Sequence, residues 1–249
     1  MKKGNPAISQ LNRYTEEFSP VEQSATYRGV FGKSLLFLGI VLASALVSSF
    51  LFNGVIVNSD GLYYALTVVC LIGAAVSGIL AYRFATPIIG SIYCVCEGFL
   101  VGCVSAVVDA EYSGFVLAAL LTTMGVLAVA ILLNMTGILK PNQKFRNFFF
   151  TALIALVVCQ LLLLLLALII PSLYVAMFQN FWLQLLISGI MVMFATFSVM
   201  IDVDNVTSLV NARLDKSYEW KAAFGLIVSL VWLYLEVLRL LVLLSDRKN

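Results

Sequence analysis

The sequence of 249 residues contains no histidine, and only 11% of its residues are charged. Without histidine, a Ser-His catalytic arrangement is excluded, and the GxGD pattern of intramembrane aspartyl proteases is also absent. The formal net charge of +2 is too small to indicate a basic surface that binds nucleic acid. We therefore expect neither an enzyme nor a nucleic-acid-binding protein, and no cofactor.

Hydrophobic residues make up 62% of the chain, and the mean hydropathy of +1.03 lies far above that of soluble domains. Seven apolar stretches are long enough, at about 1.5 Å per residue, to cross about 30 Å of hydrocarbon. They are residues 34–53, 62–82, 88–109, 113–135, 147–170, 179–201 and 220–244. The sequence thus predicts an all-α integral membrane protein: one seven-helix transmembrane domain at 34–249, preceded by a polar tail at 1–33.

The five cysteines all fall inside apolar stretches, where they most simply act as small hydrophobic residues. They are Cys70, Cys94, Cys96, Cys103 and Cys159. A metal site using Cys94 and Cys96 is a weak alternative, because residues i and i+2 of a helix point to different faces. No metal site is assigned on this basis.

Basic residues alternate between the predicted loops. Residues 1–33 hold five Lys and Arg, Arg83 lies in the second loop, and 140–146 and 213–221 hold three each, whereas the first, third and fifth loops have none. The positive-inside rule then places the N-terminus in the cytoplasm, and seven crossings place the C-terminus outside. The basic pair at 247–248 would prefer the inner side, so a re-entrant last segment is the alternative; we favour crossing.

Carboxylates inside the predicted spans are the main functional clue, because a charge at mid-membrane costs about 2.5–3.5 kcal/mol. Glu97 lies near the middle of the third span with no basic residue in that span. Glu236 lies deep in the seventh and could form a structural pair with Arg239, three residues on. Asp202, with Asp204 close by, lies at the inner end of the sixth, where both could simply be solvated.

The alternative to these structural interpretations is a proton-sensitive cation site inside the bundle. Two neighbouring carboxylates repel when both are ionised, and a proton, a bridging cation or a basic side chain relieves that repulsion. Protonation could therefore open or close a path. Oxygen ligands suit Ca²⁺ better than softer metals.

Four segments of the chain resemble the bacterial branch of the Bax inhibitor 1-like family of seven-helix membrane proteins. They are the N-terminal NPAISQL with the entry segment ATYRGVFGKSLLFLGIVL, EGFLVG in the third span, MIDVDNV at the end of the sixth, and YEWKAAFGLIVSLVWLYLEVLRLL in the seventh. The last two, in this order, are the more specific ones. Together the four segments span most of the chain.

The resemblance implies a bundle whose last helix is central, in a bacterial plasma membrane. It also implies a pH-sensitive calcium leak governed by one acid on the sixth helix and one on the seventh. By motif these are Asp202 and Glu236, and Glu97 matches an acid of the third helix. Glu236 stands where much of the family has Asp, and the family's basic partner in the second helix has no clear counterpart, since Arg83 comes only at that helix's end.

Asp202 and Glu236 can meet only if their helices project past the apolar stretches, because Glu236 lies about 24 Å beyond position 220 along a helix. We therefore expect helix well beyond Asp202, a turn near Asp215-Lys216 and an early start to the last helix. The second functional hypothesis is a non-conducting regulatory protein. Such a protein would bind other membrane proteins, for instance proteases, and the acids would serve only packing.

Overall fold

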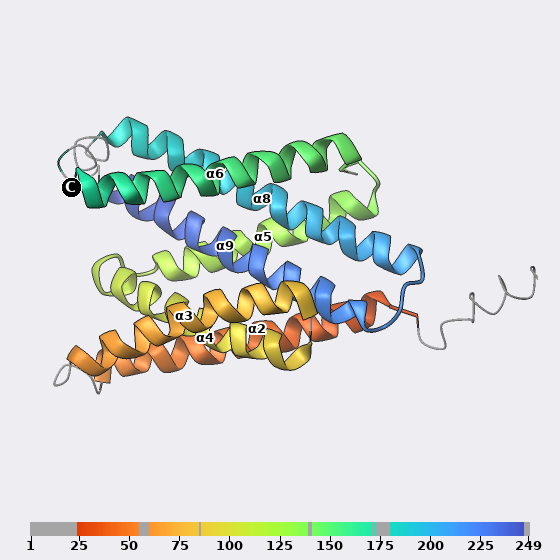
Figure 1. Ribbon diagram of the computed structural model, residues 1–249, viewed down its shortest axis with the longest axis horizontal. Coiled ribbons are helices and arrows are strands. Elements are labelled where there is room, and N and C mark those ends of the chain that lie inside the picture. Colours follow the sequence, from red (N-terminus) through yellow and green to blue (C-terminus); the bar gives the residue numbers. More distant parts are fainter. Residues whose placement is uncertain are drawn as a thin grey trace, which may run out of the picture.

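The computed structural model describes residues 24–54, 60–84, 86–138, 141–170, 172 and 180–246, which hold seven helices and no strand (Figure 1). The helices are α2 (Tyr27–Gly54), α3 (Asp60–Phe84), α4 (Pro87–Glu111), α5 (Phe115–Met135), α6 (Gln143–Ile169), α8 (Phe181–Asn211) and α9 (Tyr218–Asp246). Each holds most of one predicted apolar stretch, so the all-helical fold and the number of helices are confirmed.

Six of these helices are long and apolar enough to cross a membrane, and α3 contains a shorter apolar stretch, Ala65–Ala81. The chain is thus an integral membrane protein. Helix α2 begins at Tyr27, before the predicted edge at residue 34, so the more polar residues that precede the apolar stretch are also helical. The rest of the predicted tail, residues 1–23, lies outside the described residues.

Glycine and proline set several helix ends, as their positions in the sequence predict. Pro87 is the first residue of α4, where its missing N–H costs nothing, and the Thr86 hydroxyl accepts a hydrogen bond from the Ile89 amide at 3.4 Å. Gly114 before α5 and Gly137 after it have φ angles of 86° and 72°, a region that glycine adopts without strain. Gly61, in contrast, lies inside α3.

Helices α2 and α4 approach each other closely through glycine. A Cβ added at Gly98 would lie 2.5 Å from the Val41 carbonyl oxygen, and one at Gly102 would lie 2.3 Å from that of Ala45. These two glycines, four residues apart, form one face of α4. Small residues in this spacing let membrane helices pack backbone to backbone, and here they fix α4 against α2.

Helix α9 is the most buried of the six long apolar helices, with 56% of its most apolar segment inside the protein, against none for α6. It packs against α2, α3, α4, α5 and α8. Ser229, Tyr234 and Glu236 of this helix are buried against protein, whereas Arg239 is exposed. The candidate site is found along this helix.

Helix α6 lies at the periphery and packs on α8 through two ring contacts, Phe145 on Phe197 and Phe149 on Phe194. The leucine run that begins at residue 161 is largely exposed, as Leu161 and Leu162 show with exposed fractions of 56% and 60%. In a membrane protein such a surface contacts lipid tails, as the sequence predicts.

The link between α8 and α9 follows the predicted extension. Helix α8 continues to Asn211, well beyond Asp202, the turn contains Asp215 and Lys216, and α9 begins at Tyr218. The start of α9 precedes the apolar stretch by only two residues, so most of the extension lies in α8. This turn meets the start of α2, because the Ala25 amide donates to the Leu214 carbonyl at 2.8 Å.

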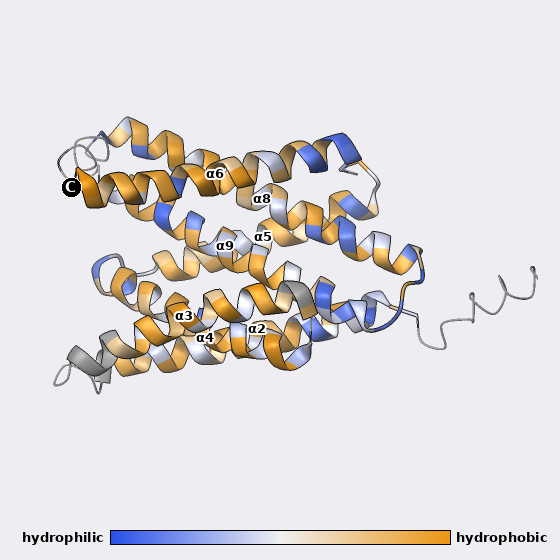
Figure 2. Cartoon of the chain, viewed as in Figure 1, coloured by the Kyte–Doolittle hydropathy of each residue, from blue (hydrophilic) through white to orange (hydrophobic). Residues whose placement is uncertain are grey.

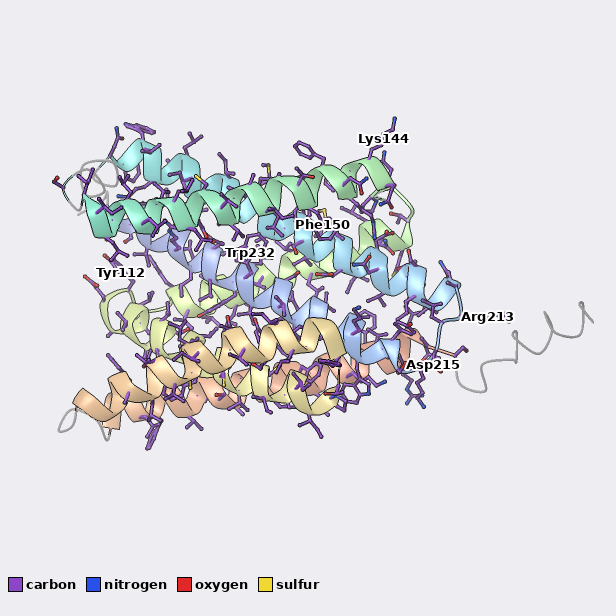
Figure 3. All side chains as sticks on the ribbon, viewed as in Figure 1. Tyr112, Lys144, Phe150, Arg213, Asp215 and Trp232 are labelled. Atoms are coloured by element: carbon purple, nitrogen blue, oxygen red, sulfur yellow. The ribbon has the colours of Figure 1, made fainter. Side chains whose placement is uncertain are left out.

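The two ends of the molecule differ in character. The labelled side chains of Lys144, Arg213 and Asp215 lie at the end with the α8–α9 turn, and Tyr112 lies at the opposite end (Figure 3). Hydrophilic segments gather at the first of these ends, whereas the middle parts of the helices are mostly hydrophobic (Figure 2). At the other end, the Tyr112 hydroxyl donates to the Asp246 carboxylate, which ties the end of α4 to that of α9.

Candidate functional site

Asp202 contacts α9 through a serine. The Ser229 hydroxyl donates to Asp202 Oδ2 at 2.5 Å, and Asn205 Nδ2 donates to Oδ1 at 3.3 Å. Ser198 Oγ lies 2.7 Å from Ser229 Oγ, so a hydrogen-bonded row runs from Ser198 through Ser229 to Asp202. Neither serine was predicted from the sequence as a site residue. A small residue, Gly225, lies beside the carboxylate, where an added Cβ would be 3.4 Å from Oδ1.

Glu236 is buried in α9 with an exposed fraction of 8%. Its Oε1 accepts a hydrogen bond from the indole N–H of Trp232 at 3.2 Å, and its Oε2 has no hydrogen-bond partner among the described residues. Arg239 is exposed, and the ion pairs of the described chain do not include Glu236 with Arg239. The proposed structural pair therefore does not explain why Glu236 is buried.

The way in which residues of α8 and α9 lie opposite each other shows how Asp202 and Glu236 are positioned. Ser229 and Glu236 are seven residues apart, so they share a face of α9 at a separation of two turns, about 10 Å. The structure thus places Ser229, and not Glu236, opposite Asp202, and each carboxylate has its own hydrogen-bond partner. Direct sharing of a proton or an ion by the two acids stays a prediction.

Ser188 lies further along the same interface. Ser229 contacts Ser198 and Asp202, and Glu236 comes seven residues later in α9. Because α8 and α9 run in opposite directions, the α8 residues opposite Glu236 come seven residues earlier: Met191 and Ala195, both of which are buried. Ser188 lies on the same α8 face one to two turns further on, and its exposed fraction is 0%. Within the described part of the chain, Ser188 Oγ and Glu236 Oε2 are the two buried side-chain oxygens without a hydrogen bond.

Glu97 is half-buried in α4, and no hydrogen bond to its carboxylate is found among the described residues. It lines a groove between α3, α4 and α9 together with Gly78, Tyr93 and Leu235. This groove is separate from the α8–α9 row, so Glu97 is not part of the same cluster.

Asp204 forms a second polar cluster near the end with the α8–α9 turn. Arg146 of α6 donates to its Oδ2 at 2.9 Å, and Asn134 of α5 donates to its Oδ1 at 3.1 Å. Asn134 in turn accepts from the Thr207 hydroxyl. Asp204 therefore holds three helices together, and this contact explains its presence without an ion pathway.

A buried ion pair that the sequence analysis missed joins α2 to α9. Lys33 Nζ lies 2.7 Å from Glu219 Oε2, and the Glu219 side chain is only 1% exposed. The amide and hydroxyl of Thr26 donate to Glu219 Oε1 at 2.8 and 3.3 Å. A Cβ at Gly29 would overlap this carboxylate, so glycine is needed there. Lys33 and Glu219 each lie directly before an apolar stretch, and this position is the sequence signal that could have identified them.

The positions of the cysteines fit the interpretation that they act as small hydrophobic residues. All five are free thiols, and Cys94 is fully buried while Cys96 beside it packs on Gly73. Among the residues that the structure describes, no group of three or more Cys, Asp or Glu side chains is arranged to hold a metal ion.

The fold and these contacts define a class: a helical integral membrane protein with a row of polar groups buried between its last two helices. A family model described as "Bax inhibitor 1 like" matches residues 5–246, nearly the whole chain. The chain belongs to this family, which confirms the resemblance carried by its motifs. No curated protein was found to be similar.

Proposed function

We propose that the protein is a pH-sensitive cation leak of the Bax inhibitor 1-like type, with calcium as the cation, and that ions pass along the α8–α9 interface. In this proposal α9 is the centre of the bundle. The burial of α9 and its contacts with five other helices support that arrangement. The pathway runs from Asp202 and Ser229 past Glu236 toward Ser188.

The observation that carries the proposal is the buried, half-satisfied carboxylate of Glu236. A buried polar atom without a hydrogen bond costs about 1–3 kcal/mol, and a carboxylate in a membrane span costs more. Among the described residues, Glu236 forms no ion pair with Arg239 or any other basic side chain that would offset this cost. A proton or a cation at Oε2 would offset it, and both are species that a pH-sensitive leak must handle.

The chemistry of the row favours a hard cation. Its groups are carboxylate and hydroxyl oxygens from Asp202, Ser198, Ser229, Glu236 and Ser188. Calcium accepts six to eight such oxygens in flexible geometry, including water. The groups are spread over several turns and do not form one cage, which suits a cation that moves and not one that is stored.

The same groups give the sign of the pH dependence. Ionised carboxylates attract a cation, whereas protonated ones do not. The charged groups that act on the row are Arg239 beside Glu236 and Arg146 near Asp202. Because both arginines stay charged at neutral pH, the acids set the change, and we expect more flux at pH 8 than at pH 6.

The basic residues support one orientation in the membrane. Arg28, Lys33, Lys144 and Arg146 lie near the starts of their helices and Arg213 lies in the α8–α9 turn, all at the end with that turn. By the positive-inside rule we propose that this end faces the cytoplasm of a bacterial cell, with the N-terminus inside. The predicted pathway then opens to the cytoplasm near Asp202.

Calcium entry into liposomes that contain the purified protein tests the proposal. We expect entry above that of empty liposomes at pH 8, less entry at pH 6, and a loss in Asp202→Asn at pH 8. Glu97→Gln should reduce entry less, because Glu97 lies in a separate groove. No entry at either pH would reject the leak and favour the regulatory hypothesis, and entry unchanged in Asp202→Asn would reject the pathway.

A further inference from the structure

An apolar cavity lies between α2, α4, α5 and α9, away from the α8–α9 row. Its volume is about 170 Å³, and it is open on one side. Its walls are apolar side chains except for Ser49, Ser105, Thr123 and Tyr234. The Thr123 hydroxyl already donates to the Ala119 carbonyl at 2.8 Å, so the polar character of the cavity comes from the other three.

Those three polar residues mark one end of the cavity. Tyr234 Oη lies 2.6 Å from Ser105 Oγ, and Ser49 and Ser105 also line a smaller cavity that includes Asp109 and Gly114. The two cavities therefore share a wall, and the smaller one is at the end of the molecule where α4 turns into α5. Asp109 is exposed, so its carboxylate stands at the mouth.

We propose that this pair of cavities binds one membrane phospholipid that carries a primary ammonium headgroup. Part of one acyl chain lies in the apolar cavity, and the ammonium group donates to the Asp109 carboxylate at the mouth. Apolar walls with a few convergent polar groups are usual for sites that bind small amphiphilic ligands.

Charge at the mouth selects the headgroup. Asp109, Glu111 and Asp246 are the charged residues of the described chain at this end of α4 and α9, and all three are acidic. An anionic headgroup would be repelled by them, and a quaternary ammonium could not donate a hydrogen bond to the carboxylate. An acyl chain suits the cavity because apolar cavities do not hold water.

Native mass spectrometry of the detergent-purified protein tests the proposal. The protein is equilibrated with equal amounts of phosphatidylethanolamine, phosphatidylcholine and phosphatidylglycerol that have the same acyl chains. We expect one bound lipid, with phosphatidylethanolamine enriched about two- to five-fold, the range for one exposed charge pair. Equal retention of the three lipids, or enrichment of either of the others, would overturn the proposal.

Two matched pairs of variants separate the two halves of the site. Leu120→Trp fills the cavity and should abolish the bound lipid, whereas Leu121→Trp is the control, since Leu121 is 65% exposed and does not line it. Asp109→Asn should keep a bound lipid but lose the headgroup preference, and Asp215→Asn, at an exposed acid of the opposite end, should retain it. If Leu120→Trp does not fold, Val116→Phe fills the same space from one turn away. Equal results within either pair would refute the assignment, and this outcome does not depend on calcium flux.

Discussion

Replacing Lys33 with methionine tests the buried ion pair that joins α2 to α9. The substitution removes the charge and keeps most of the side-chain volume. It leaves the Glu219 carboxylate buried with only the two donors of Thr26. Removing one partner of a buried pair costs about 3–5 kcal/mol, and the two remaining donors place the expected loss of unfolding free energy at about 3 kcal/mol.

The companion variant Glu219→Gln removes the negative charge but can still accept from the Thr26 amide, and Lys33 is partly exposed. We expect a loss of about 1 kcal/mol for it. The double variant should lose about 2 kcal/mol and not the sum of about 4, because no buried charge is left unpaired. The coupling energy is then about 2 kcal/mol.

Unfolding in mixed micelles by titration with dodecyl sulfate, followed by tryptophan fluorescence, measures these free energies. Trp220 is a suitable reporter, because Lys33 Nζ lies 4.7 Å from the centre of its ring. Lys144→Met is the control at an exposed lysine, with an expected change within about 0.5 kcal/mol. A loss in Lys33→Met no larger than in this control, with no coupling, would refute the role of the pair.

Two further predictions concern packing and pH. Gly102→Ala should lower the unfolding free energy by about 1–3 kcal/mol in the same titration, because the new Cβ meets the Ala45 carbonyl, whereas Gly125→Ala, with open space around it, should not. The hydrogen bonds from Ser217 hold the pKa of Asp215 below its usual value. The stability that the ionised Asp215 adds to the fold is therefore present above the pKa of Asp215 in the unfolded chain, and it is lost as the pH falls through the lower pKa of Asp215 in the folded protein. Asp215→Asn should therefore leave the pH 6 to pH 8 change in calcium entry unaltered; a changed ratio would show that the turn takes part.

The apolar runs predicted the seven helices because length and hydropathy are local properties of the sequence. The extension of α8 beyond Asp202 was also predictable, since no glycine or proline interrupts that region. The positions of Pro87 and Gly114 gave helix ends for equally local reasons.

Contacts between helices were not predictable in the same way. Hydropathy gives neither the tilt nor the register of neighbouring helices, so nothing in the sequence placed Ser229 opposite Asp202. Lys33 and Glu219 are 186 residues apart, and each looks like an ordinary interfacial charge until the fold brings them together. Asp204 was grouped with Asp202 by its position in the chain, but on a helix residues i and i+2 face different ways, and Asp204 binds Arg146 instead.

We propose that Glu236 carries the pH response of a cation path between α8 and α9. The most direct measurement is the ratio of initial calcium entry at pH 8 to that at pH 6 for Glu236→Gln in liposomes, beside wild type and Glu111→Gln, an exposed acid outside the interface. We expect a ratio near one for Glu236→Gln and a ratio well above one for the other two proteins. A Glu236→Gln protein that keeps the wild-type ratio would contradict it.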